Sequence, residues 1–236
     1  MTTFSQLVDE IVNETRRPDL RPDIANYLNQ TIRELHFTPD RGNVIHYREN
    51  LREAQLVANI ETGFGWNIPN PAIFQGIQAV RYDSVVNRSG DNYATERLPS
   101  RGLVNHKLFY YRAGSRYFFA DYGGLNAIIS LAYYEYPRML KYYPEDSRPA
   151  EWDLEAMDFV YSNAFDDNES LKLDARNLTS NWLLVRWSTV ISEGLKAKVY
   201  KRISDDARAR TSYSLYSQLR QGLYTSEIAV GGELHQ

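Results

Sequence analysis

Histidines are the first side chains to test for chemistry, because histidine is the commonest metal ligand and a frequent general base. The chain has four: His36, His46, His106 and His235. No two of them have the i, i+4 spacing with which one face of a helix binds zinc. The chain also has no cysteine, which excludes thiol nucleophiles, cysteine-bound metals and disulfides. We therefore expect no metal and no cofactor, and we interpret each histidine as a surface or packing residue.

Glycine and serine motifs give no catalytic signature either. Gly63-Phe64-Gly65 begins like a phosphate-binding loop, but the third glycine and a following lysine are missing. This pattern favours a simple turn. No Gly-x-Ser-x-Gly elbow occurs, so serine hydrolysis has no visible nucleophile.

Carboxylates leave one enzymatic alternative open. The acidic run 166–169 lacks the alternating ligands and the central glycine of a calcium loop, which favours a solvated loop. Glycoside cleavage needs only a pair of carboxylates, and no pair stands out among the 30 Asp and Glu residues. A carboxylate-dependent cell-wall hydrolase is therefore the least favoured alternative, and the prediction is that the protein is not an enzyme.

One group of cations is the best candidate for contact with DNA, and it lies near the end of a predicted helix: Lys196, Lys198, Lys201 and Arg202. Asp205 and Asp206 follow at once, and the chain as a whole has a net charge of −3. A dedicated nucleic-acid binder usually has a strong basic excess. The pattern therefore favours a helix junction balanced by local ion pairs, although it is compatible with a weak phosphate contact inside a larger assembly.

The N-terminal elements that must position such groups are two helices. Thr3 and Gln6 have the capping-box spacing, and an apolar stripe follows over 4–12. Pro18 predicts an end near Arg17. A second helix can then begin at Pro22, with 38–42 as the loop that ends it. We expect these two helices to form an antiparallel pair over 1–42.

The middle of the chain changes to strand periodicity. Residues 77–82 alternate at period two, and 125–136 reads as one long strand closed by Pro137. The segments 107–112 and 116–122 flank Ala113-Gly114-Ser115 and predict a hairpin with a three-residue loop. Short connections between strands imply an antiparallel sheet, so we expect an inserted β domain over 43–137.

The last third is predicted to be helical. Residues 138–177 are expected to be an irregular connection in which 152–165 forms a short helix. Apolar groups surround the next helix from Trp182, which indicates a buried central element. Ser204 or Asp205 can cap another helix that runs to about Ser226. The long helices occupy 178–227, and 228–236 is expected to be an extended tail. The fold class is therefore α+β, a helical body built from both chain ends with the β domain inserted between them.

The last long helix has a wider arc of apolar and tyrosine residues than one packing partner requires, and an apolar tail follows it. Tyrosine occurs 18 times in the chain and suits both interfaces and strands. The predicted intermolecular contacts are Tyr213, Tyr216, Leu219, Leu223, Tyr224, Ile228 and Val230. No stretch approaches the roughly 18 apolar residues of a membrane span, so we expect no membrane partner.

Both helical ends resemble a known class of virion proteins. The stretches Phe4–Val12, Arg16–Leu20 and Ile24–Leu35, and near the other end Gly194–Tyr200, Asp205–Arg210 and Tyr213–Tyr216, are similar to head-to-tail connectors of tailed bacteriophages. The β domain has no such likeness. The resemblance implies a non-catalytic adaptor assembled in the host cytoplasm and located in the virion.

In that class the subunit forms a ring, commonly of twelve copies, between the portal protein and the tail proteins. The resemblance therefore implies contact with the portal, with the tail and with other copies, and passage of genomic DNA through the central channel without sequence specificity. An alternative is a tail-completion or tail-tube ring with the same helical body and a different partner.

Overall fold

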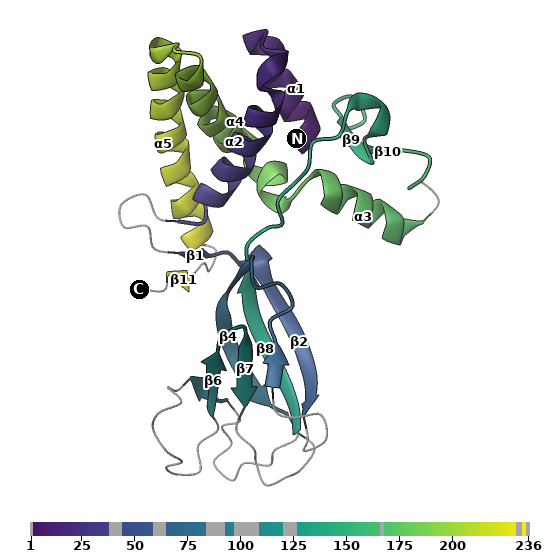
Figure 1. The fold of residues 1–236 in the computed structure, drawn as a ribbon, viewed down its shortest axis with the longest axis vertical. Helices are drawn as coiled ribbons and strands as arrows, with labels where there is room; N and C mark the ends of the chain where they lie inside the picture. Colours follow the sequence, from purple (N-terminus) through teal and green to yellow (C-terminus); the bar gives the residue numbers. More distant parts are fainter. Residues whose placement is uncertain are drawn as a thin grey trace. The chain divides into compact units, whose positions relative to one another are not determined.

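The computed structural model describes residues 2–37, 44–58, 65–83, 93–96, 109–119, 127–165, 168–229 and 233–234. It divides into two compact units. One consists of 1–49 together with 137–236, and the other of 50–136. The α+β class and the helical body built from both chain ends are confirmed (Figure 1). The inserted unit begins at Asn50, whereas 43 was the predicted start, because Ile45–His46 pairs within the first unit.

Four helices form the body of the first unit: α1 (Phe4–Thr15), α2 (Arg21–Glu34), α4 (Trp182–Arg202) and α5 (Asp206–Ala229). The predicted capping box of α1 is present, since the Thr3 hydroxyl accepts from the Gln6 backbone and the Gln6 side chain accepts from the Thr3 backbone. A 3-10 turn, Pro18–Leu20, separates α1 from α2. Asp205 caps α5 by accepting a hydrogen bond from the backbone of Arg208. These ends lie where the sequence predicted them.

The central position predicted for α4 is confirmed. Leu184, Ile191 and Leu195 are fully buried, and the helix packs against α1, α2 and α5. Trp187 interrupts its regular geometry with a non-helical backbone, which makes a kink one turn after the start. The shared core contains apolar residues from all four helices. The two ends of the chain therefore stabilise each other through one core.

Side chains of α1 and α2 form hydrogen bonds with the backbone of the segment that follows the β unit. The amide of Asn29 donates to the Leu140 carbonyl at 2.9 Å and accepts from the Leu140 backbone at 3.0 Å. The Ser5 hydroxyl accepts from the backbone of Tyr143 at 2.8 Å. These contacts satisfy backbone groups that an irregular segment would otherwise leave unpaired.

The predicted helix over 152–165 is wrong. The segment contains a hairpin of β9 (Ala150–Asp153) and β10 (Asp158–Tyr161), and helix α3 (Glu169–Thr179) follows it. The carboxylate of Asp153 accepts from two backbone amides in the turn, and Met157 has a φ of 54°, so the chain reverses instead of continuing as a helix. We call residues 150–179, which comprise β9, β10 and α3, the arm.

The second unit contains two sheets around a shared apolar core. One has the order β2-β8-β4, with β2 (Leu51–Ala58), β8 (Ala127–Glu135) and β4 (Phe74–Tyr82). The other has the order β3-β7-β6-β5, with β3 (Gly65–Asn67), β7 (Arg116–Phe119), β6 (Phe109–Ala113) and β5 (Thr95–Glu96). All pairs are antiparallel except β5 and β6.

The hairpin of β6 and β7 has a shorter loop than predicted. Ala113 pairs with Arg116, so the loop contains only Gly114 and Ser115. Gly114 has a φ of 63°, as the first position of a two-residue type II′ loop requires. The predicted strand ends at Lys107 and Leu125 lie outside the described residues.

The chain end also differs from the predicted extended tail. Helix α5 continues to Ala229, and Glu233–Leu234 forms β11, which pairs with β1 (Ile45–His46). The described part of the tail is therefore a helix end and a short strand on the chain's own first unit.

Candidate functional site

The predicted intermolecular surface on α5 divides into a buried and an exposed part. Tyr216, Leu223 and Tyr224 are buried in the core of the chain itself, and Leu219 is partly buried against it. The assignment of the three buried residues to a contact with another molecule is therefore wrong for this chain, and that of Leu219 stays a prediction. The spacing of apolar residues shows how wide the apolar face of a helix is, but not whether that face packs against the same chain or against another molecule. Tyr213, by contrast, is 64% exposed.

The buried tyrosines attach α5 to the end of α2. The hydroxyl of Tyr224 donates to the Phe37 carbonyl, and Arg220 donates to the same carbonyl at 2.6 Å. Arg220 also lies over the rings of Tyr216 and Tyr224. Burial raises the pKa of Tyr224, and the neighbouring Arg220 lowers it by a smaller amount. These residues position α5 and leave its opposite face for other contacts.

The remaining predicted contacts lie at the end of α5. Ile228 belongs to the last turn of that helix by its backbone. Val230 lies outside the described residues.

The predicted DNA-contacting cations are mostly engaged within the helical body. Lys196 lies 3.2 Å from the Glu14 carboxylate of α1, and Lys198 lies 2.6 Å from Glu34 of α2. Arg202 lies 3.7 Å from Asp23. Lys201 is exposed beside them. The ion-paired helix junction favoured by the sequence is therefore present.

A cleft of about 370 Å³ lies beside these cations, where α1, α4 and α5 meet. The hydroxyl of Tyr200 donates to the Glu14 carboxylate at its edge. Burial raises the pKa of Tyr200 to about 12, with a further contribution from Glu14. Burial alone would raise the pKa of Glu14, but hydrogen bonds from Tyr200 and Lys196 lower it overall. The cleft therefore has a fixed, ionised carboxylate beside a lysine.

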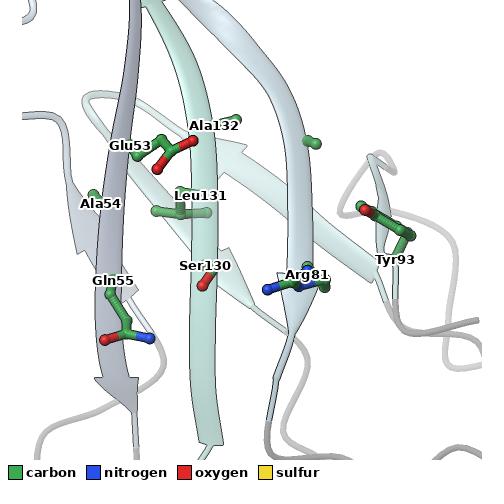
Figure 2. A pocket seen from close by; sticks show the side chains of 9 residues that line it. Glu53, Ala54, Gln55, Arg81, Tyr93, Ser130, Leu131 and Ala132 are labelled. Atoms are coloured by element: carbon green, nitrogen blue, oxygen red, sulfur yellow. The ribbon is translucent and has the colours of Figure 1, made fainter.

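The second unit has a larger hollow of about 520 Å³ on the outer face of the β2-β8-β4 sheet (Figure 2). Small side chains of β8 form its floor. Figure 2 shows Glu53 and Gln55 on one side of that strand and Arg81 and Tyr93 on the other. The alternation of β4 and β8 produces this arrangement, because Val80 and Leu131 face the core.

One serine in this hollow has a carboxylate partner. Ser130 donates a hydrogen bond to Asp83, and Arg81 lies 2.5 Å from the same carboxylate. Burial would raise the pKa of Asp83, but the hydrogen bonds from Ser130 and Arg81 lower it overall. This serine therefore has an ionised carboxylate rather than an imidazole as its partner, and the arrangement is not a nucleophile–histidine pair.

Sequence reasoning missed the arm as a candidate site. Within the part of the chain that the structure describes, twelve large apolar side chains are exposed, and six of them belong to the arm: Leu154, Met157, Val160, Leu171, Leu173 and Leu178. The sequence signal was present as leucines at 171, 173 and 178 within a charged segment. The incorrect prediction of a helix over 152–165 kept this signal from being recognised.

The remaining histidines and acidic groups form no further centre in the described ranges. His36 is buried, with Nδ1 donating to the Ile32 carbonyl at 3.1 Å. Asn168 caps α3, while Asp166 and Asp167 lie outside the described residues. Among the described side chains, no three His, Cys, Asp or Glu residues group as metal ligands.

No described helix is long and apolar enough to cross a membrane. No protein-family model matches the chain, and no curated protein matches it.

Proposed function

We propose that the protein is a structural virion subunit, a head-to-tail adaptor that forms a ring between the portal and the tail of a tailed bacteriophage. One observation carries the proposal. The stretches that resemble phage connectors lie at opposite ends of the sequence, and they form one helical body in which α1 and α2 pack against α4, which packs against α5. A likeness carried by core-forming helices supports a shared architecture more strongly than one scattered over loops, because loops vary more in sequence among related proteins.

The position of α5 also supports a role in assembly. Most of its residues between 207 and 226 are exposed, while a narrow strip that includes Ser212, Tyr216 and Leu223 is buried. A long helix with one buried strip leaves a continuous surface for another subunit or for the portal. In this proposal the chain end after Ser226 contacts the portal, and Tyr213 contacts a neighbouring subunit.

The ion pairs on α4 are consistent with a channel through which DNA slides. A surface whose cations are matched by carboxylates neutralises few phosphates, so DNA bound to it is held weakly. Lys196, Lys198 and Arg202 are each matched in this way. In the proposed ring, Lys201 contributes at most a weak phosphate contact.

A pull-down with purified partners tests the adaptor against the tail-completion alternative. The full chain, immobilised, is exposed separately to the portal protein and to the tail proteins of the genome that encodes it. We expect the portal to be retained, and retention of tail proteins alone would favour the alternative. The cell-wall hydrolase alternative predicts release of peptidoglycan fragments, which the adaptor does not produce.

A further inference from the structure

The arm has a small core of its own. Trp152 and Phe159 pack edge to face with their ring centroids 5.2 Å apart, and Ala175 of α3 is fully buried against them. The side-chain amide of Gln6 bonds both the backbone N–H and the carbonyl of Trp152, which ties the arm to α1. The arm is therefore a folded attachment to the helical body.

Helix α3 turns an unusual face toward this core. Its cations lie over aromatic rings, Arg176 over Phe159 and Lys172 over Tyr161. Its leucines lie outside, where Leu173 is 57% exposed. A helix in an isolated domain normally buries its leucines. The exposed leucines of α3 leave apolar surface that gains stability only when another molecule covers it.

The arm is also strongly acidic. Residues 150–179 contain eight Asp and Glu residues and two Lys and Arg residues, a net charge of −6, although the whole chain has only −3. Glu155 and Asp174 are exposed beside the apolar side chains. The partner of this surface should therefore combine apolar or aromatic groups with positive charge.

The outer face of α5 has this chemistry. Residues 207–226 contain no Asp or Glu, and Arg210 places a positive charge on the exposed side, while the other two arginines of this range contact residues of the same chain. Arg210, Tyr213, Ser217 and Gln221 follow one another at helical spacing and are all exposed. Within the first unit, Figure 1 shows the arm and α5 on opposite sides of the other helices.

We propose that the arm of one copy docks on the outer face of α5 in the next copy. This inference rests on the proposed ring function and identifies the contact between its subunits. The arm and the outer face of α5 lie on opposite sides of the first unit (Figure 1), so they cannot contact each other within one copy. A head-to-tail contact between copies satisfies both, and when its rotation closes it generates a ring.

Charge reversal tests the contact in the full-length chain without the portal. The arm variant is Glu155→Lys/Asp174→Lys, and the α5 variant is Arg210→Glu/Gln221→Glu. All four side chains are exposed, so folding should persist, as circular dichroism will verify. Self-association is measured by sedimentation velocity at rising protein concentration. We expect each variant to associate at least about tenfold more weakly than the parent, because like charges then face each other.

Mixing the two variants gives the decisive measurement. In the mixture a reversed arm meets a reversed α5 face, so association should return to near the parent level. The control Glu10→Lys/Glu145→Lys changes two exposed carboxylates outside the arm and should associate like the parent.

The proposal is overturned if both reversed variants associate like the parent, if mixing restores nothing, or if the parent is still monomeric at about 1 mM. Portal binding of the same variants is recorded separately. Failure of portal binding alone counts against the adaptor function, whereas failure of the charge exchange counts against this contact.

Discussion

The ring of Tyr216 on α5 lies so close to Gly194 on α4 that a Cβ added to the glycine would stand 2.8 Å from a ring carbon. The same Cβ would stand 2.6 Å from the Thr31 methyl of α2. Three helices therefore approach one another at a position where only hydrogen fits. This contact explains why Tyr216 belongs to the core of the chain and not to a surface.

The first prediction follows from this close approach. Gly194→Ala should lower the free energy of unfolding by about 1–3 kcal/mol, because the added methyl group overpacks the α2–α4–α5 contact. Gly222→Ala is the matched control, since a Cβ there meets nothing within 4 Å. The control should be neutral or stabilising, because alanine favours helix. Urea unfolding measures both, and equal effects would contradict the packing account.

A second prediction concerns pH. Burial lowers the pKa of His36 to about 4, whereas an unfolded histidine titrates near 6.5. Between these values the unfolded chain binds a proton that the folded chain does not, so stability falls as the pH falls from 6.5 to 4. The loss attributable to His36 is roughly 3 kcal/mol at the lower end.

Urea unfolding at several pH values in this window tests His36 directly. His36→Gln removes the titrating group and retains a donor for the Ile32 carbonyl. The variant should lose stability less steeply than the parent as the pH falls. Parallel curves for the two proteins would show that His36 does not produce the pH dependence.

The third prediction concerns the attachment of the arm. The Arg148 side chain is only 8% exposed and forms ion pairs with Asp9 of α1 and Glu151 of β9. Arg148→Met should lower the free energy of unfolding by about 2 kcal/mol, because it leaves two partly buried carboxylates without this partner. Amides of β9 and β10 should exchange hydrogen faster.

Arg17→Met is the control for that experiment. Arg17 pairs with Asp19 on the surface, and both side chains are largely exposed. Exposed pairs contribute little to stability, so exchange in the arm should remain unchanged. Equal acceleration in both variants would show that Arg148 has no special role in holding the arm.

A fourth prediction concerns DNA. Glu34→Gln/Asp23→Asn removes the partners of Lys198 and Arg202, so both cations become available to phosphates. Affinity for a short duplex should rise, and the slope of log affinity against log salt should steepen by about two. Fluorescence anisotropy over a range of salt concentrations measures both quantities. Glu155→Gln/Asp158→Asn makes the same charge change on the arm, and identical behaviour of the two variants would contradict the ion-pair account.

Local signals predicted the starts of α1 and α5 correctly. The Thr3–Gln6 capping box and the Asp205 cap each depend on side chains within three residues, so the sequence contains the whole interaction. The core position of α4 was equally predictable, because apolar residues surround it. Strand 77–82 also lies within β4, as its alternation indicated.

Features that depend on distant partners were not predictable. Trp152 and Phe159 are seven residues apart, a spacing that fits one face of a helix as well as opposite strands of a hairpin. The hydrogen bonds of Asp153 in the turn select the hairpin. Similarly, nothing local indicates that Glu233–Leu234 pairs with Ile45–His46.

The central claim is that this chain is an adaptor that docks on a portal ring. Light scattering measures the mass of the purified chain alone and then mixed with the portal ring of the genome that encodes it. We expect a defined complex with about one copy of the chain per portal subunit, because the proposed adaptor ring stacks on the portal ring. A mixture in which portal and chain keep their separate masses at every ratio would contradict it.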